Sequence, residues 1–152
     1  MKNSETTFLN VDLDMSAKSD LQPLVSALGR RVIPLYVGRD RRRYVAHLEL
    51  ANQPKNPDQA IREFDCLIHS LPKKLQSLWA SAKVLDFNVG VQAADTPHSY
   101  ALPFSRETIE AVSALRGRIV LTIYAPYRSS RKSAPPPQTT QLSPAGMNKR
   151  SV

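Results

Sequence analysis

Hydrophobic and polar residues alternate along two segments of the chain, and this alternation predicts two β-strands. In residues 8–14, Leu9, Val11 and Leu13 alternate with polar residues, and residues 85–92 repeat the pattern. A period of two is typical of a strand with one buried face. Because the other face of both strands is polar, we expect a sheet whose second face is exposed to solvent.

The rest of the body alternates between helical and extended patterns. Ser19, Asn56 and Ser105 favour the cap position before a helix, Pro57 suits a first helical position, and Gly117 favours a helix end. We predict helices over residues 19–28, 57–70, 73–83 and 105–116, and further strands over residues 32–37, 44–50, 98–104 and 118–124. Because prolines interrupt residues 98–104, that segment is expected only as an edge strand.

These elements follow the order β-α-β-β-α-α-β-(β)-α-β, which predicts an α+β fold. The first six major elements match the ferredoxin-like βαββαβ order. The C-terminal helix and strand are expected to extend this core. We therefore expect a mixed, mostly antiparallel sheet with the helices on one face.

The positive charge of the chain is concentrated towards its C-terminal end. The formal net charge is +8, yet residues 1–125 hold 16 basic and 13 acidic residues, a charge of +3. Residues 127–152 combine basic residues with many prolines and serines and few apolar side chains. Such a segment buries too little apolar surface to fold. We expect a single α+β domain over residues 1–126 and a disordered basic tail over residues 127–152.

Features of exported or membrane-spanning chains are absent from the sequence. No stretch approaches the ~18 apolar residues that a membrane helix needs. The polar start, residues 1–7, has no apolar core of a secretory signal. Cys66 is the only cysteine, so the chain forms no internal disulfide. We therefore expect a cytoplasmic location and no membrane contact.

Several carboxylates lie on the polar faces of the two alternating strands. Asp12 and Asp14 belong to the first strand, and Asp86 and Asn88 belong to the second. In a ferredoxin-like sheet these strands are neighbours, so the four side chains are expected on one face. Oxygen ligands of this kind bind hard cations such as Mg²⁺. Because no further ligand motif accompanies them, we favour a solvated strand face over a metal site and predict no cofactor.

One helix face carries the only cysteine. At about 100° per residue, Arg62, Cys66 and His69 fall opposite the apolar stripe and are expected to be exposed. A nearby cation favours a thiolate, but a nucleophile also needs an orienting group and a pocket, which the outer face of a helix lacks. No phosphate-binding loop, nucleophile elbow or zinc pattern occurs elsewhere. We therefore predict no catalytic residues and a protein that is not an enzyme.

The connection between the second and third strands, residues 38–43, is rich in arginine. The planar guanidinium group binds both phosphates and carboxylates through paired hydrogen bonds. The alternative is a solvated turn whose charges keep other strands away from a sheet edge. If the turn binds a partner, the binding residues are Arg39, Arg41, Arg42 and Arg43.

An aromatic residue on the open sheet face would favour RNA binding by base stacking. The alternation places Phe8 on the side of Asn10 and Asp12. The acid beside it repels phosphates, and residues 42–47 lack the glycine- and aromatic-rich signature of RNA-binding sheets. We therefore predict no base-stacking RNA site.

Three pieces of the second half of the chain carry a resemblance to known sequences: the helix around Leu75–Trp79, the strand Phe87–Gln92, and the ending from Phe104–Ile109 to Leu121–Tyr124. In these pieces the chain resembles a bacterial family known only as domain of unknown function 4279. Members of that family show a similar ending, in which a Ser-x-Glu helix leads into a strand that ends in tyrosine. The family has no established activity, and some relatives are similar to immunity proteins near bacterial toxins. The resemblance implies a non-catalytic, protein-binding role.

The residues and the resemblance together favour a non-catalytic bacterial domain that binds another protein, in the manner of an immunity protein. The alternative is a basic accessory protein that contacts nucleic acid through its tail and the Arg39–Arg43 tip. A body charge of +3 and an acidic sheet face favour the first, with only weak, non-specific nucleic-acid binding through the tail. An exposed-thiol enzyme that uses Cys66 is a third, weaker interpretation.

Overall fold

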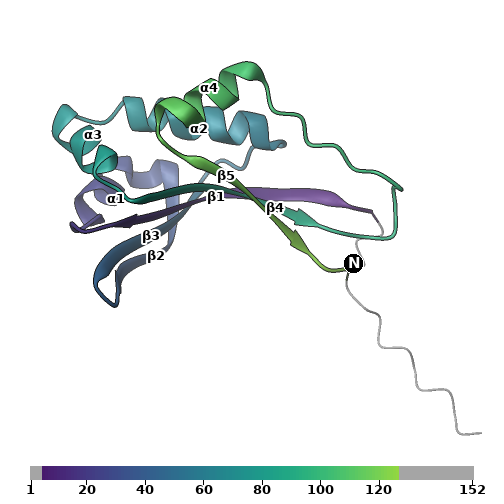
Figure 1. Cartoon of the computed structure of the whole chain (residues 1–152), viewed down its shortest axis with the longest axis horizontal. Helices are drawn as coiled ribbons and strands as arrows, with labels where there is room; N and C mark the ends of the chain where they lie inside the picture. The colour runs from purple at the N-terminus through teal and green to yellow at the C-terminus, as the bar shows by residue number, and fades with distance from the viewer. Residues whose placement is uncertain (1–4, 127–152) are drawn as a thin grey trace, which may run out of the picture.

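The computed structural model describes residues 5–126, which form one sheet and a layer of helices (Figure 1). The strands are β1 (Thr7–Ala17), β2 (Val32–Asp40), β3 (Arg43–Leu50), β4 (Val84–Gln92) and β5 (Arg118–Tyr124). The helices are α1 (Gln22–Leu28), α2 (Pro57–His69), α3 (Lys73–Ala80) and α4 (Arg106–Ala114), with a short 3-10 turn at Gly29–Arg31. Within residues 5–126, no helix has the length and apolar character needed to cross a membrane. The tail predicted to be disordered, residues 127–152, lies outside the described residues.

The sheet has five strands in the order β2-β3-β1-β4-β5. Its first three neighbouring pairs are antiparallel, and β4 and β5 are parallel. The C-terminal helix and strand thus extend the sheet beside β4. The predicted α+β class with a mixed sheet is confirmed.

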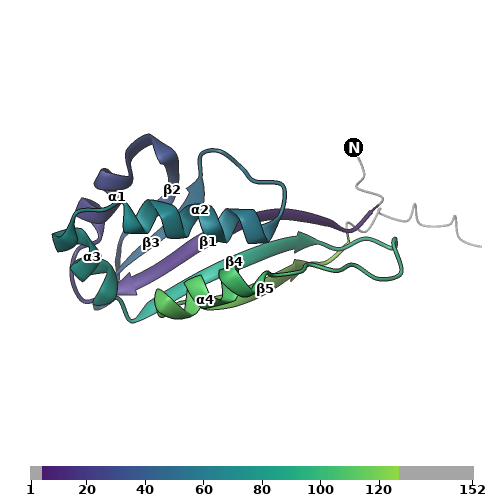
Figure 2. The ribbon, with the colours of Figure 1, turned by 90° about the horizontal axis from the view of Figure 1, so that it is seen from above.

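The helices lie on one side of the sheet, and the core lies between the two layers (Figures 1 and 2). Alternate residues of β1 and β4 face this core, and Leu13, Phe87 and Val89 are fully buried. Ile61 and Phe64 of α2 belong to the same cluster of buried residues. The rings of Phe64 and Phe87 meet edge to face, with their centroids 6.2 Å apart. Polar residues at the alternate positions of both strands form the uncovered face.

Side-chain caps begin two of the helices, as predicted. Asn56 accepts a hydrogen bond from the backbone N–H of Gln59 (2.8 Å), and Pro57 occupies the first turn of α2. Ser105 accepts a hydrogen bond from the N–H of Thr108 (3.2 Å) at the start of α4. Both caps satisfy N–H groups that have no partner inside the helix.

Two predicted helix boundaries are wrong by three residues, and the helix predicted to reach residue 116 ends at Ala114. α1 begins at Gln22 rather than at Ser19, because Asp20 accepts the hydrogen bond from the N–H of Gln22 (2.9 Å). α3 ends at Ala80 rather than at Lys83, because the N–H of Lys83 donates to the end of β1 (2.8 Å).

The edge strand predicted over residues 98–104 does not form, since this described segment is irregular. Leu102 and Phe104 pack against the core instead. Pro103 between them has no N–H to donate to a neighbouring strand. Apolar burial therefore decides the course of this connection.

Phe8 lies on the helix side of the sheet, contrary to the prediction. The pairing of β1 with β4 shifts register between Phe8 and Asn10, so that Phe8 stands opposite the buried Val91. Its side chain packs against the core, and its N–H donates to the Tyr100 hydroxyl (2.7 Å). A β-bulge adds one residue to a strand and reverses the alternation of its side chains.

Candidate functional site

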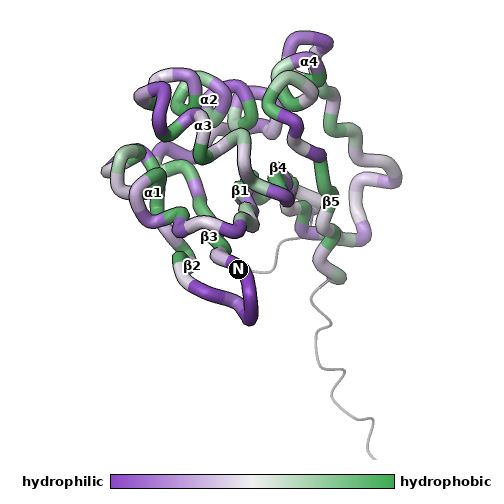
Figure 3. Tube along the Cα trace, turned by 60° about the vertical axis from the view of Figure 1, so that its left-hand side comes forward, coloured by the Kyte–Doolittle hydropathy of each residue, from purple (hydrophilic) through white to green (hydrophobic). Residues whose placement is uncertain are grey.

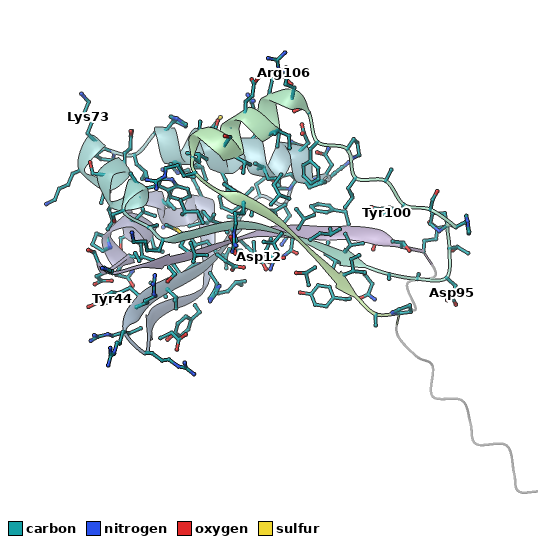
Figure 4. The ribbon with its side chains drawn as sticks, in the orientation of Figure 1. Asp12, Tyr44, Lys73, Asp95, Tyr100 and Arg106 are labelled. Atoms are coloured by element: carbon teal, nitrogen blue, oxygen red, sulfur yellow. The ribbon has the colours of Figure 1, made fainter. Side chains whose placement is uncertain are left out.

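The four polar residues expected on one sheet face do share it. The register of β1 and β4 aligns Asp12 with Asn88 and Asp14 with Asp86. Asp12 lies near the middle of the sheet (Figure 4). Different neighbours hold each carboxyl group: those of Asp14 and Asp86 come from other strands, whereas the amide that binds Asp12 belongs to β1 itself.

Asp14 is held between a histidine and an amide. Nδ1 of His47 in β3 lies 2.6 Å from Asp14 Oδ1, and Asn88 Nδ2 donates to Asp14 Oδ2 over 3.3 Å. The hydroxyl of Thr122 in β5 donates to Asn88 Oδ1 (2.7 Å). A connected set of polar contacts therefore crosses the sheet from β3 to β5.

Asp86 forms a bidentate ion pair across the parallel strands β4 and β5. Two nitrogens of Arg118 each donate to one oxygen of the carboxylate over 2.8 Å. The hydrogen bonds and the charge of Asp86 raise the pKa of Arg118 above its ordinary value. The guanidinium group is exposed, so the pair fixes geometry more than it adds stability.

The surroundings of Asp12 oppose its ionisation. Burial, followed by the charges of Glu49 and Asp14, raises the pKa of Asp12 to about 6. Asn10 Nδ2 donates both to Asp12 Oδ1 (2.8 Å) and to Glu49 Oε1. The carboxyl groups of Asp12 and Glu49 therefore lie close together and share one amide donor. Two neighbouring negative charges repel each other, so the protonated form of Asp12 is favoured.

These carboxylates are occupied by protein groups. Arg118 binds Asp86, and His47 and Asn88 bind Asp14. Over residues 5–126, no group of three or more His, Cys, Asp or Glu side chains is arranged to hold a metal ion. The polar face thus uses its oxygens to join neighbouring strands.

Replacing Asp12 with asparagine is expected to stabilise the protein at pH 7 by about 1 kcal/mol, a value reduced for solvent screening. In the unfolded chain Asp12 ionises at about pH 4, whereas its pKa in the folded chain is about 6. The folded state binds more protons between these values, so wild-type stability falls as the pH rises through this window. Urea unfolding between about pH 4 and 8 should show this fall, and Asp12→Asn should flatten it. An unchanged slope in the variant would contradict the assignment.

The helix face with the cysteine is exposed, as predicted. Arg62, Cys66 and His69 all lie on the outer side of α2, whereas Ile61 is buried. His69 Nδ1 is turned towards its own helix, 2.9 Å from the carbonyl oxygen of Asp65. This orientation does not present the imidazole as a base for the thiol.

Cys66→Ser is expected to change the free energy of unfolding by less than about 0.5 kcal/mol. The thiol of the folded protein should react with an aromatic disulfide reagent no faster than the thiol of the unfolded chain. Faster labelling in the folded state would reveal an activated cysteine.

The predicted partner-binding arginines lie at the tip of the β2–β3 hairpin. Only Arg41 and Arg42 lie between the strands, because both strands reach further than predicted. All four arginines are exposed, and Figure 3 shows the hairpin tip as a hydrophilic stretch. Arg39 lies over the ring of Tyr44, 5.5 Å from its centre.

Along its length β2 exposes large apolar side chains that the hydrophobic pattern did not predict. Ile33, Leu35 and Tyr36 are 45%, 53% and 48% exposed. The Tyr36 hydroxyl donates to the carbonyl oxygen of Arg39 (3.4 Å). Gly38 makes room for this ring, because a Cβ there would lie 2.7 Å from the hydroxyl. We name the strip made of Ile33, Leu35, Tyr36, Arg39, Arg41, Arg42 and Arg43 the β2 surface.

Comparison of the chain with family models, curated proteins and solved structures gives no match. The resemblance to the family of unknown function therefore stays a prediction.

Proposed function

We propose that this chain is a non-catalytic, cytoplasmic domain that binds another protein through its β2 surface. The observation that carries the proposal is the exposure of three large apolar side chains beside four arginines on one edge of the sheet. Protein interfaces are enriched in tyrosine and arginine relative to other surfaces. A turn that only repels other strands needs charges, but it does not need Leu35 and Tyr36 exposed next to them.

The β2 surface fits a partner that has an apolar centre and an acidic rim. The apolar residues lie along the strand, whereas the arginines are gathered at its tip, where they would pair with carboxylates. Binding of a toxin, in the manner of an immunity protein, is a narrower form of the proposal. This narrower form rests on the resemblance alone.

In this proposal, strands β1–β4 with helices α1–α3 form a ferredoxin-like core to which α4 and β5 are added. The strand order β2-β3-β1-β4 and its antiparallel pairings support this description. The fold by itself adds no argument for a function, because such folds serve many unrelated ones.

Nucleic-acid binding through the tip and the tail is the second candidate. Four exposed arginines at one turn favour it, because phosphate contacts supply most non-specific affinity. The neighbouring sheet face opposes it, since Asp14 and Glu49 would repel phosphates. The tail itself lies outside the described residues.

Matched baits test the proposal. The wild-type chain and a Leu35→Ser/Tyr36→Ser variant are immobilised, exposed to nuclease-treated lysate of the source cells, and analysed by quantitative mass spectrometry. Both substituted residues are exposed, so circular dichroism should show that the variant folds. We expect a protein enriched at least about tenfold on the wild-type bait. Identical retained proteins on the two baits would contradict the proposal.

A further inference from the structure

β5 ends the sheet opposite β2, and within residues 5–126 it pairs with β4 alone. The carbonyl oxygen of Tyr124 accepts a hydrogen bond from Ala93 N–H (2.9 Å), so this residue directs its backbone groups at β4. Backbone groups of successive strand residues point to alternate sides. Ile119, Leu121 and Ile123 therefore direct their N–H and C=O groups outwards, where they can pair with another strand.

The same three residues are apolar and border a groove. Leu121 and Ile123 are 54% and 62% exposed. The groove has a volume of about 400 Å³ and is lined by Val91, Leu102, Phe104, Ile119, Leu121 and Ile123, among others. From Ile119 to Tyr124 the strand holds no proline and no charged residue, the devices that usually keep an edge from pairing. An exposed apolar edge of this kind is typical of an interaction site.

The opposite edge, in contrast, is protected against strand addition. β2 contains Pro34, which has no N–H to donate. Its pairing with β3 shifts register between Pro34 and Tyr36, and such an irregularity twists an edge away from a new strand. The two ends of the sheet are therefore suited to different contacts.

We propose that β5 pairs with β5 of a second copy of this chain, antiparallel, about a two-fold axis at Leu121. Centring the pair on Leu121 pairs the whole of Arg118–Tyr124, whereas a shift in either direction leaves strand residues without a partner. The three outward-directed residues of each copy then form hydrogen-bonded pairs: Leu121 stands opposite itself, and Ile119 opposite Ile123. One continuous sheet results, with the apolar side chains of both edges together on the helix side.

The charges of β5 are compatible with this symmetry. Arg118 is the only charged residue of the strand, and in the register centred on Leu121 it stands opposite Tyr124 of the other copy rather than opposite another arginine. Its own Asp86 already neutralises it through two hydrogen bonds of 2.8 Å. Like charges opposite each other would be destabilising, and this register avoids them. A second copy therefore supplies backbone hydrogen-bond partners and apolar contacts to this edge, and it places no like charges opposite each other.

Light scattering after size exclusion tests the dimer with the full chain. At about 100 µM the measured mass of the wild type should approach twice the chain mass of 16.9 kDa. The fraction of dimer should fall on dilution. Leu121→Lys places a charge at the axis and should give monomers, whereas Leu35→Lys on the opposite edge should leave the dimer unchanged. Wild-type protein that stays monomeric, or a Leu121→Lys variant as dimeric as wild type, would overturn the proposal.

Cysteine cross-linking tests the register in a Cys66→Ser background. Leu121→Cys should form a disulfide between copies on oxidation, because residues in a hydrogen-bonded antiparallel pair have Cα atoms about 5.5 Å apart, within disulfide range. Ile123→Cys should not, since its two copies would lie about 13 Å apart along the strands. Equal cross-linking of the two variants, or none of Leu121→Cys, would overturn the pairing about Leu121.

Discussion

Replacing Phe87 with alanine is expected to lower the free energy of unfolding by about 3–5 kcal/mol. Phe87 is fully buried in β4, and its ring packs edge to face on Phe64 of α2. The substitution therefore opens a cavity where the helix layer meets the sheet. Urea unfolding measures the effect, with Ile33→Ala on exposed β2 as a control expected to cost less than about 1 kcal/mol. A loss for Phe87→Ala no larger than that of the control would contradict this packing.

A substitution at Gly117 tests the packing of the Phe87 ring independently. A Cβ at Gly117 would lie 2.7 Å from Phe87 Cε2 and 3.3 Å from the carbonyl oxygen of Leu85. Gly117→Ala should therefore cost about 1–3 kcal/mol by overpacking. In the Phe87→Ala background much of this cost should disappear, which gives a coupling free energy of about 1 kcal/mol or more in a double-mutant cycle. Additive effects would rule out the ring as the cause.

The second large effect concerns affinity for the partner protein. Tyr36→Ala is expected to weaken binding about 30-fold or more, since a truncated tyrosine at the centre of an interface costs about 2 kcal/mol or more. Tyr36 lies between the apolar residues of the β2 surface and its arginines, and its hydroxyl reaches the backbone of Arg39. Removal of the Tyr36 ring therefore affects partner contacts of both the apolar residues and the arginines of the β2 surface. Titration calorimetry with the captured partner measures the loss.

Tyr124 supplies the matched control for Tyr36. The two tyrosines are equally exposed, 49% and 48%, but they lie on opposite edges of the sheet. Tyr124→Ala should leave the affinity for the partner within about threefold. Equal losses for the two substitutions would show that the interface does not lie on β2.

Much of the fold is predictable from local signals. The alternation in residues 85–92 describes β4, and Asn56 and Ser105 mark the starts of α2 and α4. These patterns act within a few residues, so they need no knowledge of distant neighbours. The common face of Asp12 and Asn88 also follows, once β1 and β4 are taken as neighbours.

Features that depend on distant contacts were not predictable in this way. The β-bulge that turns Phe8 to the core arises from the pairing of β1 with β4. His47 joins the polar network only because β3 lies beside β1. Gly117 has the position of a helix stop, yet Arg116 takes the positive φ of 59°, while the ring of Phe87 excludes a side chain at Gly117.

The β2 surface did leave a signal in the sequence. Ile33, Leu35 and Tyr36 surround Pro34 in a run that does not alternate. A proline inside a strand indicates an edge, and an edge strand with apolar residues at successive positions must expose some of them. These apolar side chains favour a protein partner more strongly than the arginines of the neighbouring turn do, because arginines alone also suit phosphates.

Two titrations, each at physiological and at raised salt, test the central claim, protein binding rather than nucleic-acid binding, most directly. One uses the captured partner and the other a random-sequence DNA duplex, each with wild type and with Arg41→Ser/Arg42→Ser/Arg43→Ser. We expect sub-micromolar affinity for the protein at about 0.15 M salt, most of it kept at about 0.5 M, and DNA binding weaker than about 10 µM. The opposite result would be sub-micromolar DNA binding at about 0.15 M salt that is lost in the triple variant. If the logarithm of that DNA affinity also fell with the logarithm of the salt concentration, with a slope of about −0.9 per phosphate contacted, the account would be contradicted.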